Sequence, residues 1–187
     1  MTGCGYRGLS AKDHSAIFLP PIKGDYEGKL YANLAESLAS VGAFSNSLSN
    51  SDLELTVEVT DDPFREQEKE IGFRFARNPF NKETKMLVPS ERRQSLFARI
   101  TLKDTSTGKV VFGPKTLRAE VDYDFDSDLF DDKAVPVGGA NVPLVRYSLG
   151  QLENHETARE TARGELTRKL ASKITSYITC VRPICLK

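Results

Sequence analysis

The sequence predicts an α+β fold in which two helices pack on one face of a small, mostly antiparallel sheet of four to five strands. Apolar and polar residues alternate over 53–59, 94–103 and 109–125, which is the period of a half-buried strand. Over 27–42 and 153–178, apolar residues instead recur every three or four positions, as they do in amphipathic helices. Two helices that each carry one apolar stripe can bury both stripes against one face of a sheet.

The first predicted elements are a short strand and a helix. The apolar run at 17–19 predicts a buried strand that ends at the Pro20-Pro21 pair. A helix is predicted over 27–42, with Asp25 able to cap its start and Gly42 suited to its end. Its apolar stripe consists of Leu30, Leu34, Leu38 and Val41.

The central elements are a strand over 53–59 and a long hairpin of 94–103 with 109–125. A turn containing Gly108 joins the two hairpin strands, and Gly113-Pro114 indicates a bulge or kink in the second one. The polar face of these strands is predicted to meet water or a partner. It carries Glu54, Glu58, Arg99, Lys103, Arg118, Glu120, Asp122 and Asp124.

The remaining segments are less regular, apart from the last helix. We expect a strand and then a mobile loop over 61–93, and a long loop over 126–150. The helix over 153–178 has an apolar residue every four positions. These residues are Ala158, Ala162, Leu166, Leu170, Ile174 and Ile178.

Composition limits the class of protein. The chain has 187 residues, of which 39% are hydrophobic and 28% charged, so we expect one globular domain over 15–187 behind a tether at 1–14. The formal net charge is zero, which provides no long-range field to attract nucleic acid. The sequence has no apolar run of the about 18 residues that a membrane-spanning helix needs.

The three cysteines leave alternatives open. Cys4 is a small residue in a flexible tail, a reactive or metal-binding thiol, or the lipid acceptor of a Thr2-Gly3-Cys4 lipoprotein signal. The last interpretation expects a charged and apolar leader to be encoded upstream. Cys180 and Cys185 are either a disulfide pair in an oxidising compartment or free thiols, because Pro183 between them does not by itself prove closure. Their spacing is not one that zinc sites favour, and no metal is predicted.

The basic stretch at 73–93 is the candidate binding site. Apolar residues, among them Phe73, Phe75 and Leu87, are interleaved with its cations, which suits a ligand with phosphates and acyl chains, or an anionic membrane. A charged hairpin without a specific ligand is the alternative. The candidate anion-binding residues are Arg74, Arg77, Lys82, Lys85, Arg92 and Arg93.

The sequence offers little for catalysis or for a cofactor. The acidic run at 122–132 does not match a calcium loop, because Ser127 and Lys133 stand where that loop needs Gly and Glu. His14 and His155 lie in polar contexts, and the sequence contains no nucleophile elbow and no glycine-rich phosphate loop. We therefore expect neither an enzyme nor a cofactor.

Several of these features occur in the same order in a known family. They are the C-G-Y start, FLPPI, KLYANLAESLASVG, LELTVEV, the turn at Asp104-x-x-Thr-Gly-Lys and ARETARGELTRKLASKI. In this order they resemble the LptE-like lipopolysaccharide-assembly lipoproteins of Gram-negative outer membranes.

The resemblance implies a non-enzymatic role. Cys4 would carry the lipid anchor at the periplasmic face of the outer membrane. The protein would help to assemble and plug an LptD-type β-barrel, and would bind lipopolysaccharide. The alternatives are another envelope lipoprotein, acting as a scaffold or enzyme activator, and a cytosolic adaptor or nucleic-acid-binding module. The last predicts salt-sensitive binding through 73–93.

Overall fold

A computed structural model of the chain describes residues 15–60, 68–77, 85–125, 134–137, 140–143 and 155–185. The predicted tether at 1–14 lies outside these residues. The chain divides into two compact units, and strands β5 and β6 and helix α2 contribute residues to both. Unit 1 comprises 1–60, 97–117 and 170–187, and unit 2 comprises 61–96 and 118–169. The predicted extent of one domain, 15–187, stays a prediction.

The predicted α+β class is confirmed: the structure has two long helices and a six-stranded sheet. The sheet is mixed, however, because β1 (Ile17–Phe18) pairs in parallel with both β2 (Phe44–Ser45) and β3 (Leu53–Val59). The other sheet strands are β4 (Glu68–Arg77), β5 (Lys85–Asp104) and β6 (Val110–Asp124). The order is β2-β1-β3-β5-β4, with β6 paired to β5.

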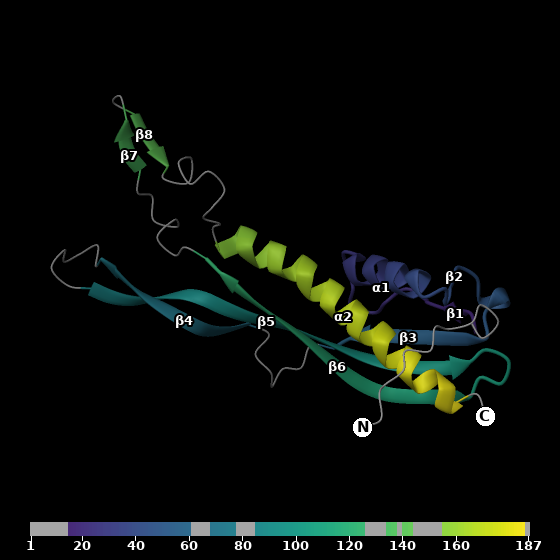
Figure 1. Ribbon diagram of the computed structural model, residues 1–187. Helices are drawn as coiled ribbons and strands as arrows, with labels where there is room; N and C mark the ends of the chain where they lie inside the picture. Colours follow the sequence, from purple (N-terminus) through teal and green to yellow (C-terminus); the bar gives the residue numbers. More distant parts are fainter. Residues whose placement is uncertain are drawn as a thin grey trace, which may run out of the picture. The chain divides into compact units, whose positions relative to one another are not determined.

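Unit 1 contains the elements that the sequence predicted best. Helix α1 (Lys29–Ser40) lies beside the short strands β1 and β2 (Figure 1). The Asp25 carboxylate accepts a hydrogen bond from the backbone N–H of Tyr31 at 2.8 Å, so it satisfies one of the free donors at the helix start. Gly42 follows the helix with a φ of 67°. A single-turn 3₁₀ helix (Leu48–Asn50) then leads into β3.

The core of unit 1 lies between the two helical stripes and one sheet face. Strands β3 and β5 pair antiparallel, and the charged residues of their other face stand opposite one another, as Glu54 does to Lys103 and Glu58 to Arg99. The ring of Tyr177 on α2 packs 5.5 Å from that of Phe112 on β6. The buried residues of this core include Leu30, Leu34, Leu38, Leu55, Val57, Ile100, Leu102, Leu170, Ile174 and Ile178.

Unit 2 contains a hairpin that the sequence analysis expected as a strand followed by a mobile loop. Strand β4 pairs with residues 85–94 of β5, so the mobile loop expected in the second part of 61–93 is wrong for residues 85–93. Pro89 makes this strand difficult to predict from the sequence, because proline is disfavoured inside sheets. Pro89 stands opposite Phe73, next to a register shift in the β4–β5 pairing between Gly72 and Phe73. Sheets accommodate proline at irregularities of this kind.

Two other predicted segments differ from the structure. The predicted loop at 126–150 contains strands β7 (Ala134–Val137) and β8 (Ala140–Pro143), which pair antiparallel around a Gly-Gly sequence typical of tight turns. Helix α2 runs from His155 to Cys185, and so the CVRPIC segment continues the helix that was predicted to end at 178. Among the described residues, no helix is long and apolar enough to span a membrane.

Candidate functional site: the β4–β5 hairpin

Strand register places the candidate site on the β4–β5 hairpin of unit 2. Glu70 stands opposite Arg92, and Lys69 stands opposite Arg93. Because neighbouring residues on a strand point to opposite faces, the two arginines lie on different sides of the sheet. The buried residues Tyr123 of β6 and Phe125, which directly follows β6, share the side of Arg92, and Asp122 shares that of Arg93.

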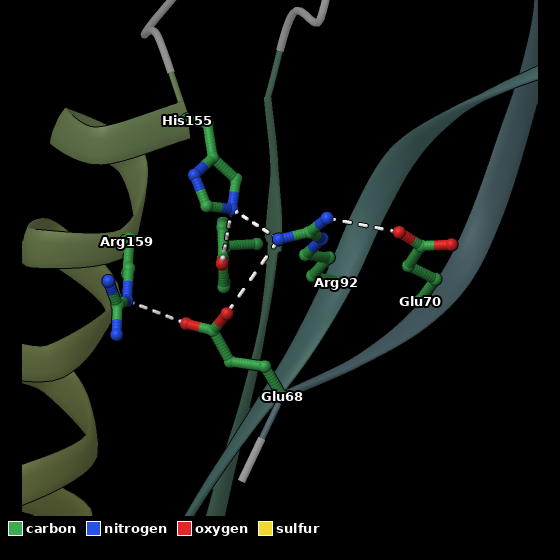
Figure 2. Close-up of polar contacts among 6 residues, drawn as sticks. Glu68, Glu70, Arg92, His155 and Arg159 are labelled. Carbon is green, nitrogen blue, oxygen red and sulfur yellow. Dashed lines mark hydrogen bonds and ion pairs between the residues drawn. The ribbon is translucent and has the colours of Figure 1, made fainter. Parts of the chain in front are cut away.

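Arg92 is the centre of a polar cluster built from four elements, which we call the Arg92 cluster (Figure 2). One of its terminal nitrogens lies 2.7 Å from Nε2 of His155, at the start of α2. The other donates to Glu70 at 3.0 Å. Arg92 also lies 3.7 Å from Glu68, which forms a 2.7 Å ion pair with Arg159. The cluster comprises Glu68, Glu70, Arg92, Tyr123, His155 and Arg159.

The contact with Arg92 fixes the state of the His155 ring. A guanidinium has only donors, so Nε2 of His155 must accept, and the proton of the neutral ring lies on Nδ1. Burial lowers the pKa of His155, and the nearby positive charge of Arg92 lowers it further. The hydroxyl of Tyr123 lies 3.4 Å from the same nitrogen, and burial raises the pKa of that phenol. The cluster therefore holds a neutral imidazole whose Nε2 lone pair is already occupied.

Arg93 has a carboxylate partner on the other sheet face. Its Nε and one terminal nitrogen donate to the two oxygens of Asp122 at 2.7 and 2.8 Å. This paired hydrogen bonding lowers the pKa of Asp122 and raises that of Arg93. Both of these predicted anion-binding residues, Arg92 and Arg93, thus face carboxylates of the same chain, and an anionic ligand would have to compete with them.

The other predicted cations lie further along the hairpin. Arg74 is half-buried on β4. The backbones of Arg77 and Lys85 pair with each other at the far end of the hairpin, two positions beyond Phe75 and Leu87. Lys82 lies outside the described residues.

Three exposed apolar side chains form what we call the hairpin patch: Phe73, Phe75 and Leu87. Their exposed fractions are 51%, 73% and 57%. Phe75 stands directly opposite Leu87, and Phe73 is two positions away on the same strand, so the three share one face of the hairpin. These residues were singled out from the sequence as part of a mobile loop, in which no strand register would bring them together.

A depression of about 470 Å³ lies between the patch and the Arg92 cluster. Its lining combines one aromatic ring with two acids and two bases: Glu68, Lys69, Glu70, Phe73 and Arg92. Sequence reasoning did not anticipate the cluster, because His155 and Glu68 are distant in the chain and only the fold brings them to Arg92.

The remaining predicted site residues are mostly untested. Cys4 lies outside the described residues. Cys180 is exposed on α2, whereas the side chain of Cys185 is not among those described, so their pairing stays a prediction. Within the described part of the chain, no three potential ligands gather into a metal site.

Comparison with known proteins finds similarity among solved structures. No family model matches the sequence, and no curated protein matches it. A minor lipoprotein from Acinetobacter baumannii is similar with a TM-score of 0.47 and 15% identity, over 90% of this chain and 95% of that one. A DUF330-family protein from Xanthomonas campestris has a TM-score of 0.47 and 9% identity, over 88% and 84%.

A third similar structure is a lipoprotein from Neisseria meningitidis, with a TM-score of 0.32 and 12% identity, over 62% of this chain and 89% of that one. Two of the three are thus bacterial lipoproteins by their descriptions. Because every TM-score lies below 0.5, the proposals that follow take their support from the residues of this chain.

Proposed function

We propose that this protein is a lipid-anchored lipoprotein of the Gram-negative envelope that binds lipopolysaccharide through its β4–β5 hairpin. The observation that carries the proposal is the hairpin patch. Exposed Phe75 and Leu87 each lie two positions along their strands from a basic residue, Arg77 on β4 and Lys85 on β5, whose backbones pair with each other. Apolar side chains beside cations match the acyl chains and phosphates of one lipopolysaccharide molecule.

The apolar contacts supply most of the binding free energy in this proposal. Burying a Phe or Leu side chain fully contributes about 1.5–3 kcal/mol. The cations Arg92 and Arg93 contribute less than the sequence suggested, because each already has a carboxylate partner. The contact with lipopolysaccharide therefore lies toward the end of the hairpin at Arg77 and Lys85 rather than at the end with Arg92 and Arg93.

The anchor and the partner complete the proposal, and both follow from the resemblance to LptE-like lipoproteins. Cys4 would carry the lipid at the periplasmic face of the outer membrane, and an LptD-type β-barrel would be the protein partner. The role is non-enzymatic: the protein docks, binds lipopolysaccharide and supports assembly of the barrel.

Binding of fluorescently labelled lipopolysaccharide to the purified protein tests the proposal. We expect Phe75→Ser and Leu87→Ser each to weaken binding about tenfold, because about 1.4 kcal/mol of apolar burial is lost. Tyr26→Ser is the matched control, because Tyr26 is 97% exposed and lies in unit 1. Its affinity should stay within about twofold of wild type.

Two outcomes would contradict the proposal. One is an unchanged affinity in both hairpin variants. The other is equally strong, equally patch-dependent binding to vesicles of phosphatidylglycerol and phosphatidylcholine, which would assign the patch to acidic membranes in general. Circular dichroism of each variant establishes that it remains folded.

A further inference from the structure

In unit 2, one edge of strand β6 is paired, and no described strand pairs with the other edge, which we call the open edge. Among the described strands, β6 pairs with β5 alone. The N–H of Phe125 points to β5, where it donates to Ser90. The side-chain contacts of Arg93 with Asp122 and of Ser95 with Glu120 fit the same register.

This register fixes which backbone groups face outward. In an antiparallel strand, the N–H and C=O of successive residues point alternately to the two sides. Because Phe125 points toward β5, the backbone groups of Asp124 and Asp122 point to the open edge. Such an edge is a template for another extended chain.

A groove lies against this edge, on the side of helix α2. Its volume is about 320 Å³, and its lining includes four consecutive residues of β6, 121–124. Consecutive strand residues belong to both faces of the sheet, so a groove that touches all four lies along the strand edge. The helix contributes one stripe, at positions separated by three or four residues: Ala158, Thr161, Ala162 and Glu165.

The chemistry of the groove indicates its occupant. Ala158 and Ala162 are buried, whereas Thr161 is the exposed residue of the α2 stripe in the groove. Asp122, Asp124 and Glu165 place three carboxylates around the groove. Asp122 is engaged with Arg93 and Glu165 with Arg168, so Asp124 is the carboxylate best placed to meet a cation.

We propose that the open edge of β6 and the adjacent stripe of α2 bind an extended, basic segment of a partner polypeptide by β-strand addition. Main-chain hydrogen bonds to Asp122 and Asp124 would provide the pairing, and the added strand would pass beside the exposed Thr161 on α2. This surface is separate from the hairpin patch and does not depend on the proposed binding of lipopolysaccharide.

The test uses the full chain and a fluorescein-labelled peptide of alternating lysine and valine, seven residues long, as the probe. Asp124→Pro removes the outward N–H together with the charge, whereas Asp124→Ala removes the charge alone. Proline is tolerated where a strand N–H faces outward, so β6 is expected to stay paired with β5. We expect D124P to bind the peptide at least about tenfold more weakly than D124A, because a strand hydrogen bond is lost and the backbone edge is blocked.

A second pair of variants tests the groove without altering the strand. Thr161 is exposed in the groove, and Ser172 is exposed elsewhere on α2. Thr161→Tyr should weaken peptide binding at least about tenfold, and Ser172→Tyr should leave it within about twofold.

The proposal is overturned if the wild-type protein does not bind the peptide, if D124P binds as D124A does, or if both tyrosine variants bind as wild type does. Phe75→Ser separates the two proposals. This variant should bind the peptide as wild type does. Loss of lipopolysaccharide binding therefore bears only on the hairpin patch, and loss of peptide binding bears only on the open edge of β6.

Discussion

At the residue scale, the neighbours Arg92 and Arg93 show which properties of the candidate site could be predicted from the sequence. In the sequence, both belong to one cationic stretch that is predicted to be available to an anion. In the structure, each forms ion pairs with a carboxylate on another strand, Glu70 for Arg92 and Asp122 for Arg93. Charge alone was predictable, but these partners depend on strand register, and no local pattern in the sequence specifies which strands pair.

The pH dependence of stability follows from His155. Its pKa in the folded protein lies below the ordinary value of 6.5, so the unfolded chain binds more protons around that pH. The stabilising contribution is therefore complete above about pH 6.5 and is lost as the pH falls. We expect the free energy of unfolding in urea to decrease between pH 7.5 and 5.5.

His155→Gln supplies the control, because a glutamine carbonyl can still accept from Arg92 but does not titrate. The variant should show a shallower decrease over the same pH range, since His14 and the carboxyl groups are unchanged. Equal slopes for wild type and variant would mean that protonation of His155 is not coupled to folding.

At the element scale, long periodic segments and the short apolar strand at 17–19 were predictable, whereas β2 and the irregular segments were not. Strand β3, the hairpin of β5 and β6 beyond residue 94, and the stripes of both helices were all expected from their apolar periods. Two-residue strands such as β1 and β2 are too short to show a period, so their parallel pairing, which makes the sheet mixed, was not foreseen. These two strands are stabilised by pairing with strands that are distant in the sequence.

The hairpin of β4 and β5 shows the same limit at the candidate site. Its residues were identified from charge and apolar character, but Pro89 and the dense charges obscured the strand period over 85–93. Two register shifts, on either side of Gly72, interrupt the pairing as well. The composition of the site was therefore predictable, whereas the face shared by Phe73, Phe75 and Leu87 was not.

At the scale of the whole molecule, the proposed function combines a lipid anchor with a local binding surface. The chain has no net charge, so long-range attraction does not concentrate an anionic ligand around it. Binding must come from short-range contacts, which is why the proposal depends on the exposed apolar residues of the hairpin. More than one acyl chain is needed to hold a protein stably on a membrane, and a lipidated Cys4 would supply them.

Removal of the acceptor cysteine tests the anchor in cells. We expect Cys4→Ala to move the protein from the outer-membrane fraction to the soluble periplasmic fraction, because no acyl chains remain to partition into the bilayer. Immunoblotting of fractionated cells measures this change, and Cys180→Ala is the matched control. Retention of the Cys4 variant in the membrane at the wild-type level would refute lipid anchoring through this residue.

Photo-crosslinking in living Gram-negative cells tests the central claim most directly. A benzophenone amino acid is introduced in place of Phe75, in the hairpin patch, or in place of Tyr26, which is more exposed than Phe75 and distant from it in sequence. After irradiation, the account predicts a lipopolysaccharide adduct on the protein labelled at position 75 and none on the protein labelled at position 26. An absence of adduct at position 75, or equal adducts at both positions, would contradict the claim that the β4–β5 hairpin binds lipopolysaccharide.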